Sequence, residues 1–166
     1  MVMLSEMYLK YENLLVLHAL SPVGVLDNNH RDLKERIEYC KKNERSCFAM
    51  LHNKPFDNFG ITGIIITNGE VVYVCPEDCG SIKDFVVQMS DNDIKTTFGE
   101  IVNKWNENAY LEIYIRNPEF NDLFIIPDSV RGIPPYTKCE IETFLEENKS
   151  FNIWQISRKN GSISYI

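Results

Sequence analysis

The stretch Ala109-Tyr110-Leu111-Glu112-Ile113-Tyr114-Ile115-Arg116 is the clearest β-strand signal in the chain. Apolar residues occupy alternate positions, and the positions between them hold Tyr, Glu, Tyr and Arg. Because successive side chains of a strand point to opposite faces, one face is apolar and needs a core. The other face carries a carboxyl group between two phenols, so it is either a solvated sheet surface or the floor of a polar cleft.

Turn and strand signals on both sides of this stretch predict an antiparallel sheet. Asn68-Gly69 and Asn160-Gly161 are strong hairpin signals. The first is expected to pair Phe59–Thr67 with Glu70–Cys75, and the second to pair Phe151–Ser157 with Ser162–Ile166. Further strands are expected at Leu14–Leu20, Ser46–Leu51 and Asn121–Ile126.

About four helices are expected between these strands. The clearest is Asp93–Asn106, because its apolar residues recur every three or four positions. The others are expected at about His30–Asn43, in a short segment beginning near Ser81, and at Lys138–Glu147. The sequence therefore predicts one α+β domain over residues 1–166, with a mixed, mostly antiparallel sheet.

Charge and hydropathy limit the classes of partner. The net charge of −7 argues against a nucleic-acid surface, which needs clustered Lys and Arg, and is compatible with a basic protein partner. No apolar run approaches the roughly 20 residues of a membrane span, and Leu14–Leu20 lacks the flanks of a signal peptide. We therefore expect a cytoplasmic protein whose five cysteines are reduced.

Metal and thiol chemistry are both disfavoured. A zinc site would need four ligands to converge from Cys40, Cys47, His52, Cys75 and Cys79, and no Cys-x-x-Cys pair occurs. Cys47 and His52 could form a thiolate–imidazole pair, but no third group nearby would orient the imidazole. We expect no metal, and cysteines that behave as small buried hydrophobic residues.

Three elements occur in an order that suggests a known family. His18 lies near the end of the first expected strand, Asp57–Thr67 is a glycine-containing strand entry that ends in Thr, and Glu112 lies on a later strand. Phe124–Ile133 continues as a strand followed by Pro-Asp-Ser-Val-Arg-Gly-Ile. This arrangement resembles the mono-ADP-ribosyltransferase fold, in its bacterial toxin-like or phage-defence-like branch.

The resemblance implies that NAD is a substrate and that ADP-ribose is transferred to a macromolecular acceptor. Glu112 would then act on the ribose and stabilise the oxocarbenium-like centre, while His18 would hold the ribose. Where the family has an aromatic residue after the glycine, this chain has Ile64 and Ile65. Either Phe59 or Tyr73 substitutes for it, or the activity is lost. The residues that would contact NAD are His18, Ser21, Phe59, Gly60, Thr67, Tyr110, Tyr114 and Arg116.

The alternative is a non-enzymatic binding protein. Small size, acidic charge and the lack of a complete catalytic signature fit an immunity protein, an antitoxin or a phage inhibitor that binds a basic protein. If His18, Thr67 and Glu112 line one cleft, the transferase is favoured; if Glu112 faces open solvent and the acidic residues gather on one face, the binding protein is favoured.

Overall fold

The computed structural model describes residues 1–20, 45–57, 62–76, 89–128, 146 and 149–165. The described helices are α1 (Leu4–Lys10) and α3 (Asp91–Asn103). The described strands are β1 (Val2–Met3), β2 (Leu14–Leu20), β3 (Arg45–Leu51), β4 (Thr62–Cys75), β5 (Glu112–Ile125), β6 (Ile153–Ile156) and β7 (Ile163–Tyr165).

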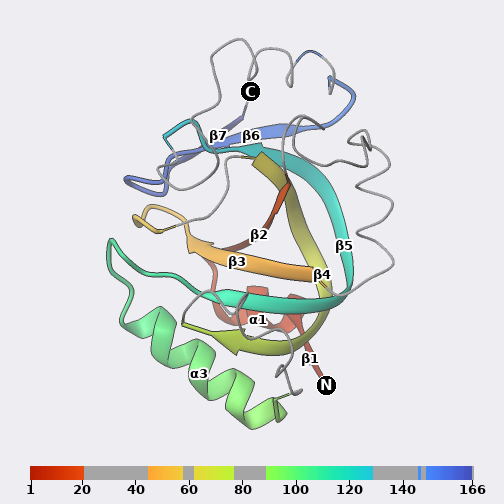
Figure 1. Cartoon of the computed structure of the whole chain (residues 1–166), viewed down its shortest axis with the longest axis vertical. Coiled ribbons are helices and arrows are strands. Elements are labelled where there is room, and N and C mark those ends of the chain that lie inside the picture. The colour runs from red at the N-terminus through yellow and green to blue at the C-terminus, as the bar shows by residue number, and fades with distance from the viewer. Residues whose placement is uncertain (21–44, 58–61, 77–88, 129–145, 147–148, 166) are drawn as a thin grey trace, which may run out of the picture.

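The strands form one sheet in the order β1-β4-β2-β3-β5-β6-β7, and an additional pairing between β4 and β5 closes part of it into a ring. The ring consists of β4, β2, β3 and β5, and each of these strands is antiparallel to its neighbours within the ring. β4 and β5 are each 14 residues long and curve around the shorter β2 and β3 (Figure 1). The mixed, mostly antiparallel α+β fold is therefore confirmed, since β5 and β6 are the one parallel pair among the described strands.

The Asn68-Gly69 pair is not a hairpin turn, and that prediction is wrong. Both residues lie inside β4, which pairs with β5 on either side of them. The register shifts around this point, and Gly69 adopts a φ of +147°. A Cβ atom on Gly69 would lie 2.3 Å from Cγ2 of Ile115, so glycine permits the close approach of β5. The dipeptide bends the long ribbon instead of reversing it.

The same bend explains why two expected strands are one. Ala109–Arg116 and Asn121–Ile126 were expected separately, but β5 runs continuously from Glu112 to Ile125. Asn117, with a φ of +51°, and Pro118 lie opposite the bend of β4. Residues that break a straight strand here introduce a bulge into a curved one.

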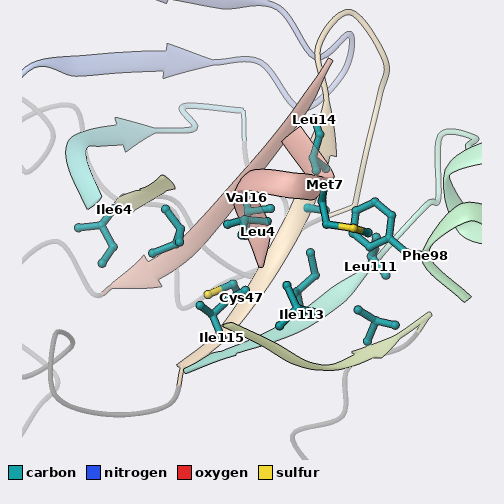
Figure 2. Close-up of a cluster of buried hydrophobic side chains, with 14 of the residues drawn as sticks. Leu4, Met7, Leu14, Val16, Cys47, Ile64, Phe98, Leu111, Ile113 and Ile115 are labelled. Atoms are coloured by element: carbon teal, nitrogen blue, oxygen red, sulfur yellow. The ribbon is translucent and has the colours of Figure 1, made fainter. Parts of the chain in front are cut away.

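The ring encloses the first hydrophobic cluster. Val16 of β2, Cys47 of β3, Ile64 of β4 and Ile113 of β5 are buried in it. Figure 2 shows these side chains together with Leu4 and Met7 of α1, and with Phe98 of α3. The alternation in Ala109–Arg116 therefore correctly predicted an inner face. It did not predict the other face, where Glu112 and Tyr114 are also buried.

A second hydrophobic cluster lies on the opposite face of the sheet. It includes Leu17 of β2, Phe48 of β3 and Phe124 of β5, together with Phe56 and Ile156. The β6–β7 hairpin borders this cluster and confirms the Asn160-Gly161 prediction, because Trp154, Gln155 and Ile156 pair with Tyr165, Ser164 and Ile163. Gly161 has the positive φ, +65°, that such a turn favours.

Of the expected helices, the Asp93–Asn106 segment is present as α3. The side chain of Ser90 caps it by accepting a hydrogen bond of 3.2 Å from the Asp93 amide. The described residues contain two helices instead of about four, and α1 was not predicted. The segments expected at 30–43 and near 81, and nearly all of 138–147, lie outside the described residues. No helix in the described segments is long and apolar enough to span a membrane.

The tyrosine of α1 takes part in the sheet hydrogen bonding. The Tyr8 hydroxyl donates to the Ile66 carbonyl and accepts a hydrogen bond of 3.2 Å from the Val16 amide. Val16 and Ile66 are directly opposite each other at one end of the β2–β4 pairing. Burial raises the pKa of Tyr8, so its hydroxyl keeps its proton. α1 is thus joined to the ring by a buried polar contact as well as by packing.

We predict that Gly63→Ala destabilises the protein strongly. A Cβ atom at Gly63 would lie 1.9 Å from the His18 carbonyl oxygen, so β2 and β4 would have to separate. The expected loss in unfolding free energy is about 3 kcal/mol, measured by chemical denaturation. Gly99→Ala is the control, because its added carbon would meet only the Tyr11 hydroxyl, at 3.2 Å. Equal effects of the two substitutions would contradict the prediction.

Candidate functional site

Glu112 is buried at the start of β5. It is 1 % exposed, and β5 is paired there on both edges, so Glu112 lies directly between Phe48 of β3 and Cys75 of β4. Directly opposite residues share a face of the sheet. Glu112 therefore belongs to the face that carries Phe48 and the second hydrophobic cluster. It is neither on an open surface nor at the floor of an open cleft.

Ser46 of β3 is the described polar partner of Glu112. Its hydroxyl donates a hydrogen bond to Oε1 of Glu112. Ser46 lies opposite Tyr114 of β5, and Tyr114 lies opposite Tyr73 of β4. Since opposite residues share a face, the Ser46, Tyr73 and Tyr114 side chains lie on the same face as Glu112. These four residues form the polar cluster on this part of the sheet.

His18 lies on the other face. It is directly opposite Ile64, which belongs to the first hydrophobic cluster inside the ring. Its Nδ1 atom lies 2.7 Å from the Ser46 carbonyl oxygen and donates a hydrogen bond to it. Burial, opposed by this hydrogen bond and reinforced by the nearby Arg45, lowers the pKa of His18 from 6.5 to about 4. His18 and Glu112 thus contact the same residue of β3 from opposite sides of the sheet.

The other predicted contacts with NAD are spread over the chain. Thr67 is exposed next to the bend of β4, and Nη1 of Arg116 lies 3.4 Å from Oε2 of Glu70 at the same bend. Tyr110 is partly buried against the second hydrophobic cluster. The structure therefore brings Tyr114 beside Glu112 and puts Thr67 and Arg116 at the bend. Ser21, Phe59 and Gly60 lie outside the described residues.

Ser46 is the member of the cluster that sequence reasoning missed. The sequence predicts Ser46 as the first residue of a short apolar strand, and its contact with Glu112 depends on the register between β3 and β5. Local sequence carries no signal for a register between strands more than sixty residues apart.

The cysteines depart from expectation at one position. Cys47 is a free thiol, 2 % exposed and part of the first hydrophobic cluster. Cys75, opposite Glu112, is disulfide-bonded. The prediction that all cysteines are reduced is therefore wrong for Cys75, because sequence spacing does not reveal which thiols meet in space. Among the residues that the structure describes, no group of three His, Cys, Asp or Glu could hold a metal ion.

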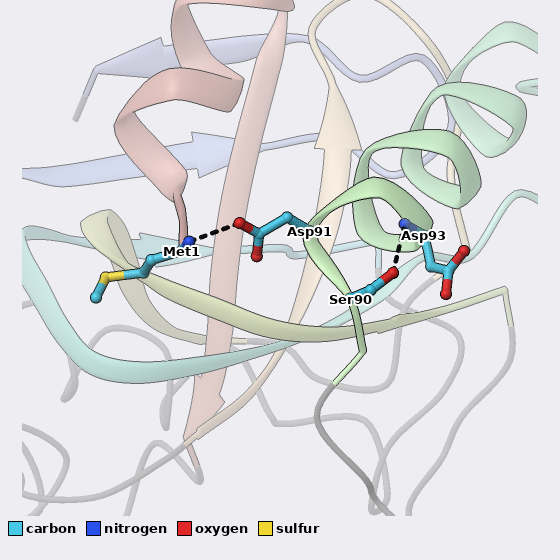
Figure 3. A network of polar contacts seen from close by, with 4 residues as sticks. All are labelled: Met1, Ser90, Asp91 and Asp93. Carbon is cyan, nitrogen blue, oxygen red and sulfur yellow. Dashed lines mark hydrogen bonds and ion pairs between the residues drawn. The ribbon is translucent and has the colours of Figure 1, made fainter.

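A second feature is a group of carboxylates at the α1 and α3 end of the molecule. The Met1 amine lies 2.6 Å from Oδ2 of Asp91, at the start of α3 (Figure 3). The hydrogen bond and charge of Asp91, and then the charges of Glu6 and Glu70, raise the pKa of this amine. Asp93 lies in the same first turn of α3. We refer to the exposed residues Glu6, Asp91 and Asp93 as the acidic patch.

Comparison with known proteins assigns no family. No protein-family model matches the sequence, and no curated protein is significantly similar to it. The polar cluster and the acidic patch are therefore the two features that bear on function.

We predict that His18 makes folding depend on pH between 6.5 and 4. Its pKa is lower in the folded state, so the unfolded state binds more protons in this window and stability falls as the pH falls. The loss is on the order of 3 kcal/mol between these pH values.

Denaturation midpoints of wild type and His18→Gln across this range test the prediction. The glutamine can still donate to the Ser46 carbonyl but does not titrate, so its stability should depend less on pH. His52→Gln, at the other described histidine, is the control for replacing a histidine by glutamine. An unchanged slope in His18→Gln would contradict the assignment.

We also predict that Ser46→Ala lowers the unfolding free energy by about 1–2 kcal/mol, because a buried carboxyl group loses a donor. Ser164→Ala on β7 is the matched control; this exposed serine should change stability by less than about 0.5 kcal/mol. Urea denaturation of both variants makes the comparison. If the two behave alike, the Ser46–Glu112 hydrogen bond contributes nothing to stability.

Proposed function

We propose that this protein is a non-catalytic binding protein whose partner is a basic protein. The observation that carries the proposal is the acidic patch at the α1 and α3 end, where Oδ2 of Asp91 already binds an ammonium group, the Met1 amine, at 2.6 Å. A site that stabilises one ammonium group also attracts others. The net charge of −7 extends this attraction to a distance and increases the rate of encounter with a cationic partner.

Part of the patch also serves the fold. Asp91 and Asp93 lie in the first turn of α3, where negative side chains complement the helix dipole. Both side chains remain exposed, although Asp91 is paired with the Met1 amine, so a partner's Lys or Arg can approach them without unfolding the helix. An immunity protein, an antitoxin or an inhibitor of a cationic protein fits this chemistry.

An NAD-using ADP-ribosyltransferase is the second candidate. It is favoured by the hydrogen bond from Ser46, which fixes the orientation of the Glu112 carboxyl group beside Tyr114. In that function Glu112 would stabilise positive charge on the ribose as the bond to nicotinamide breaks. The burial of Glu112 counts against it, because a carboxyl group that is 1 % exposed must first become accessible to touch a ribose. The orientation of His18 toward the ring interior counts against it as well.

We predict that the acidic patch controls binding to a cationic probe. Fluorescence anisotropy of a labelled octalysine peptide should show binding that weakens as ionic strength rises. Asp91→Asn/Asp93→Asn should weaken it about fivefold, which corresponds to roughly 1 kcal/mol. Glu107→Gln/Glu146→Gln is the matched control, since it removes the same charge from exposed positions outside the patch. Circular dichroism verifies that α3 remains folded.

Two results would overturn the proposal. If both double variants lose affinity equally, the peptide responds to net charge and not to the patch. If wild type releases nicotinamide from NAD and Glu112→Gln does not, the protein is an NAD-cleaving enzyme and the non-catalytic proposal is wrong. Nicotinamide release is measured with the same preparations, so the two candidate functions are compared directly.

A further inference from the structure

Two aromatic rings meet at a right angle on the β6–β7 hairpin. Trp154 of β6 and Tyr165 of β7 lie directly opposite each other. Their ring centroids are 4.8 Å apart and their planes are inclined by 85°. Tyr165 is 58 % exposed, so its ring is open to solvent although it packs on Trp154. We refer to this edge-to-face pair as the corner; Trp154 is half-buried against the second hydrophobic cluster, and Tyr165 is the more exposed of the two rings.

Hydrogen bonds hold this corner and add a negative charge to it. Nε1 of Trp154 donates to Oδ2 of Asp122 over 2.8 Å. The other oxygen, Oδ1, accepts from Nδ2 of Asn152 over 3.4 Å, and Asn152 accepts in turn from the Tyr165 hydroxyl. The polar edge of each ring is thereby tied to one carboxylate. Both rings and the charge are in position before any ligand arrives, which lowers the entropy cost of binding.

This combination matches one class of ligand. The faces of aromatic rings carry negative potential and attract cations, so a cation over the exposed Tyr165 ring would lie close to Trp154 as well. A nearby carboxylate adds direct charge attraction. The chain contains a simpler version of the contact, in which Nζ of Lys10 lies 5.5 Å from the centroid of the Tyr11 ring. The corner at Trp154 adds a second ring and a carboxylate.

We propose that the corner formed by Trp154, Tyr165 and Asp122 binds an alkylammonium group, the side-chain head of lysine or N-methylated lysine. This inference rests on the proposed function for the source of that group, a basic protein partner. The corner then anchors one lysine at the β6–β7 end, while the acidic patch attracts the partner at the α1 and α3 end. Methylation strengthens the contact, because it makes the ammonium easier to remove from water.

Fluorescence of Trp154 tests the proposal. The chain has two tryptophans, so Trp105→Phe leaves Trp154 as the single indole emitter. Titration with Nα-acetyl-trimethyllysine methylamide should give a saturable change with a dissociation constant in the millimolar range. The neutral isostere, with a tert-butyl group in place of trimethylammonium, should bind at least about fivefold more weakly.

Variants in the same Trp105→Phe background show which groups act. Tyr165→Ala and Asp122→Asn should each weaken binding about fivefold or more. Ser164→Ala is the matched control, because Ser164 precedes Tyr165 on β7 and its side chain points to the opposite face of the sheet. A lack of saturation, equal binding of the isostere, or saturation by N-acetylglucosamine in place of the ammonium compound would overturn the proposal.

The outcome separates this inference from the proposed function. Octalysine binding that depends on Asp91 and Asp93, with no response at Trp154, would overturn the corner and leave the basic partner in place. A saturable ammonium response at Trp154, without patch-dependent octalysine binding, would support the corner and overturn the proposed function.

Discussion

The pairing of β4 with β5 along nearly their whole length is the constraint on which the rest of the structure depends. The N-terminal part of β4 pairs with β2, and β3 pairs with the N-terminal part of β5, which lies at the opposite end of the β4–β5 ribbon. The ribbon must therefore bend for both pairings to form. Gly69 and Asn117 adopt the positive φ values that permit the bend. Without it the ring would open and Val16, Ile64 and Ile113 would lose their common interior.

The alternating pattern and the helical rhythm were sufficient to predict several elements. β2 was predicted with its exact bounds, α3 begins and ends within three residues of expectation, and the Asn160-Gly161 hairpin is present. The same dipeptide signal failed at Asn68-Gly69. An Asn-Gly pair shows that the backbone can bend easily at that point. It does not show whether the chain reverses into a hairpin or continues as one curved strand that pairs with a strand far away in the sequence. That choice is made by β5, some fifty residues away.

The candidate site shows a similar limit. The prediction that Glu112 lies on the face opposite Ile113 is correct. The polar residues of this face gave no indication that it is buried. The cover follows from β5 having neighbours on both edges and a second hydrophobic cluster on that face. The transferase hypothesis requires His18 and Glu112 to share a cleft. Their separation follows from the registers of β2 with β4 and of β3 with β5, which the sequence of one strand does not contain.

The position of Tyr8 has a consequence for the motions of the protein. Its hydroxyl lies between the Val16 amide and the Ile66 carbonyl. A side chain of α1 therefore forms hydrogen bonds with both strands at the end of the β2–β4 pairing. α1 therefore cannot leave the ring without exposing both backbone groups. Undocking of α1 and separation of β2 from β4 become one cooperative event, so the first ten residues belong to the same unit of local unfolding as the ring.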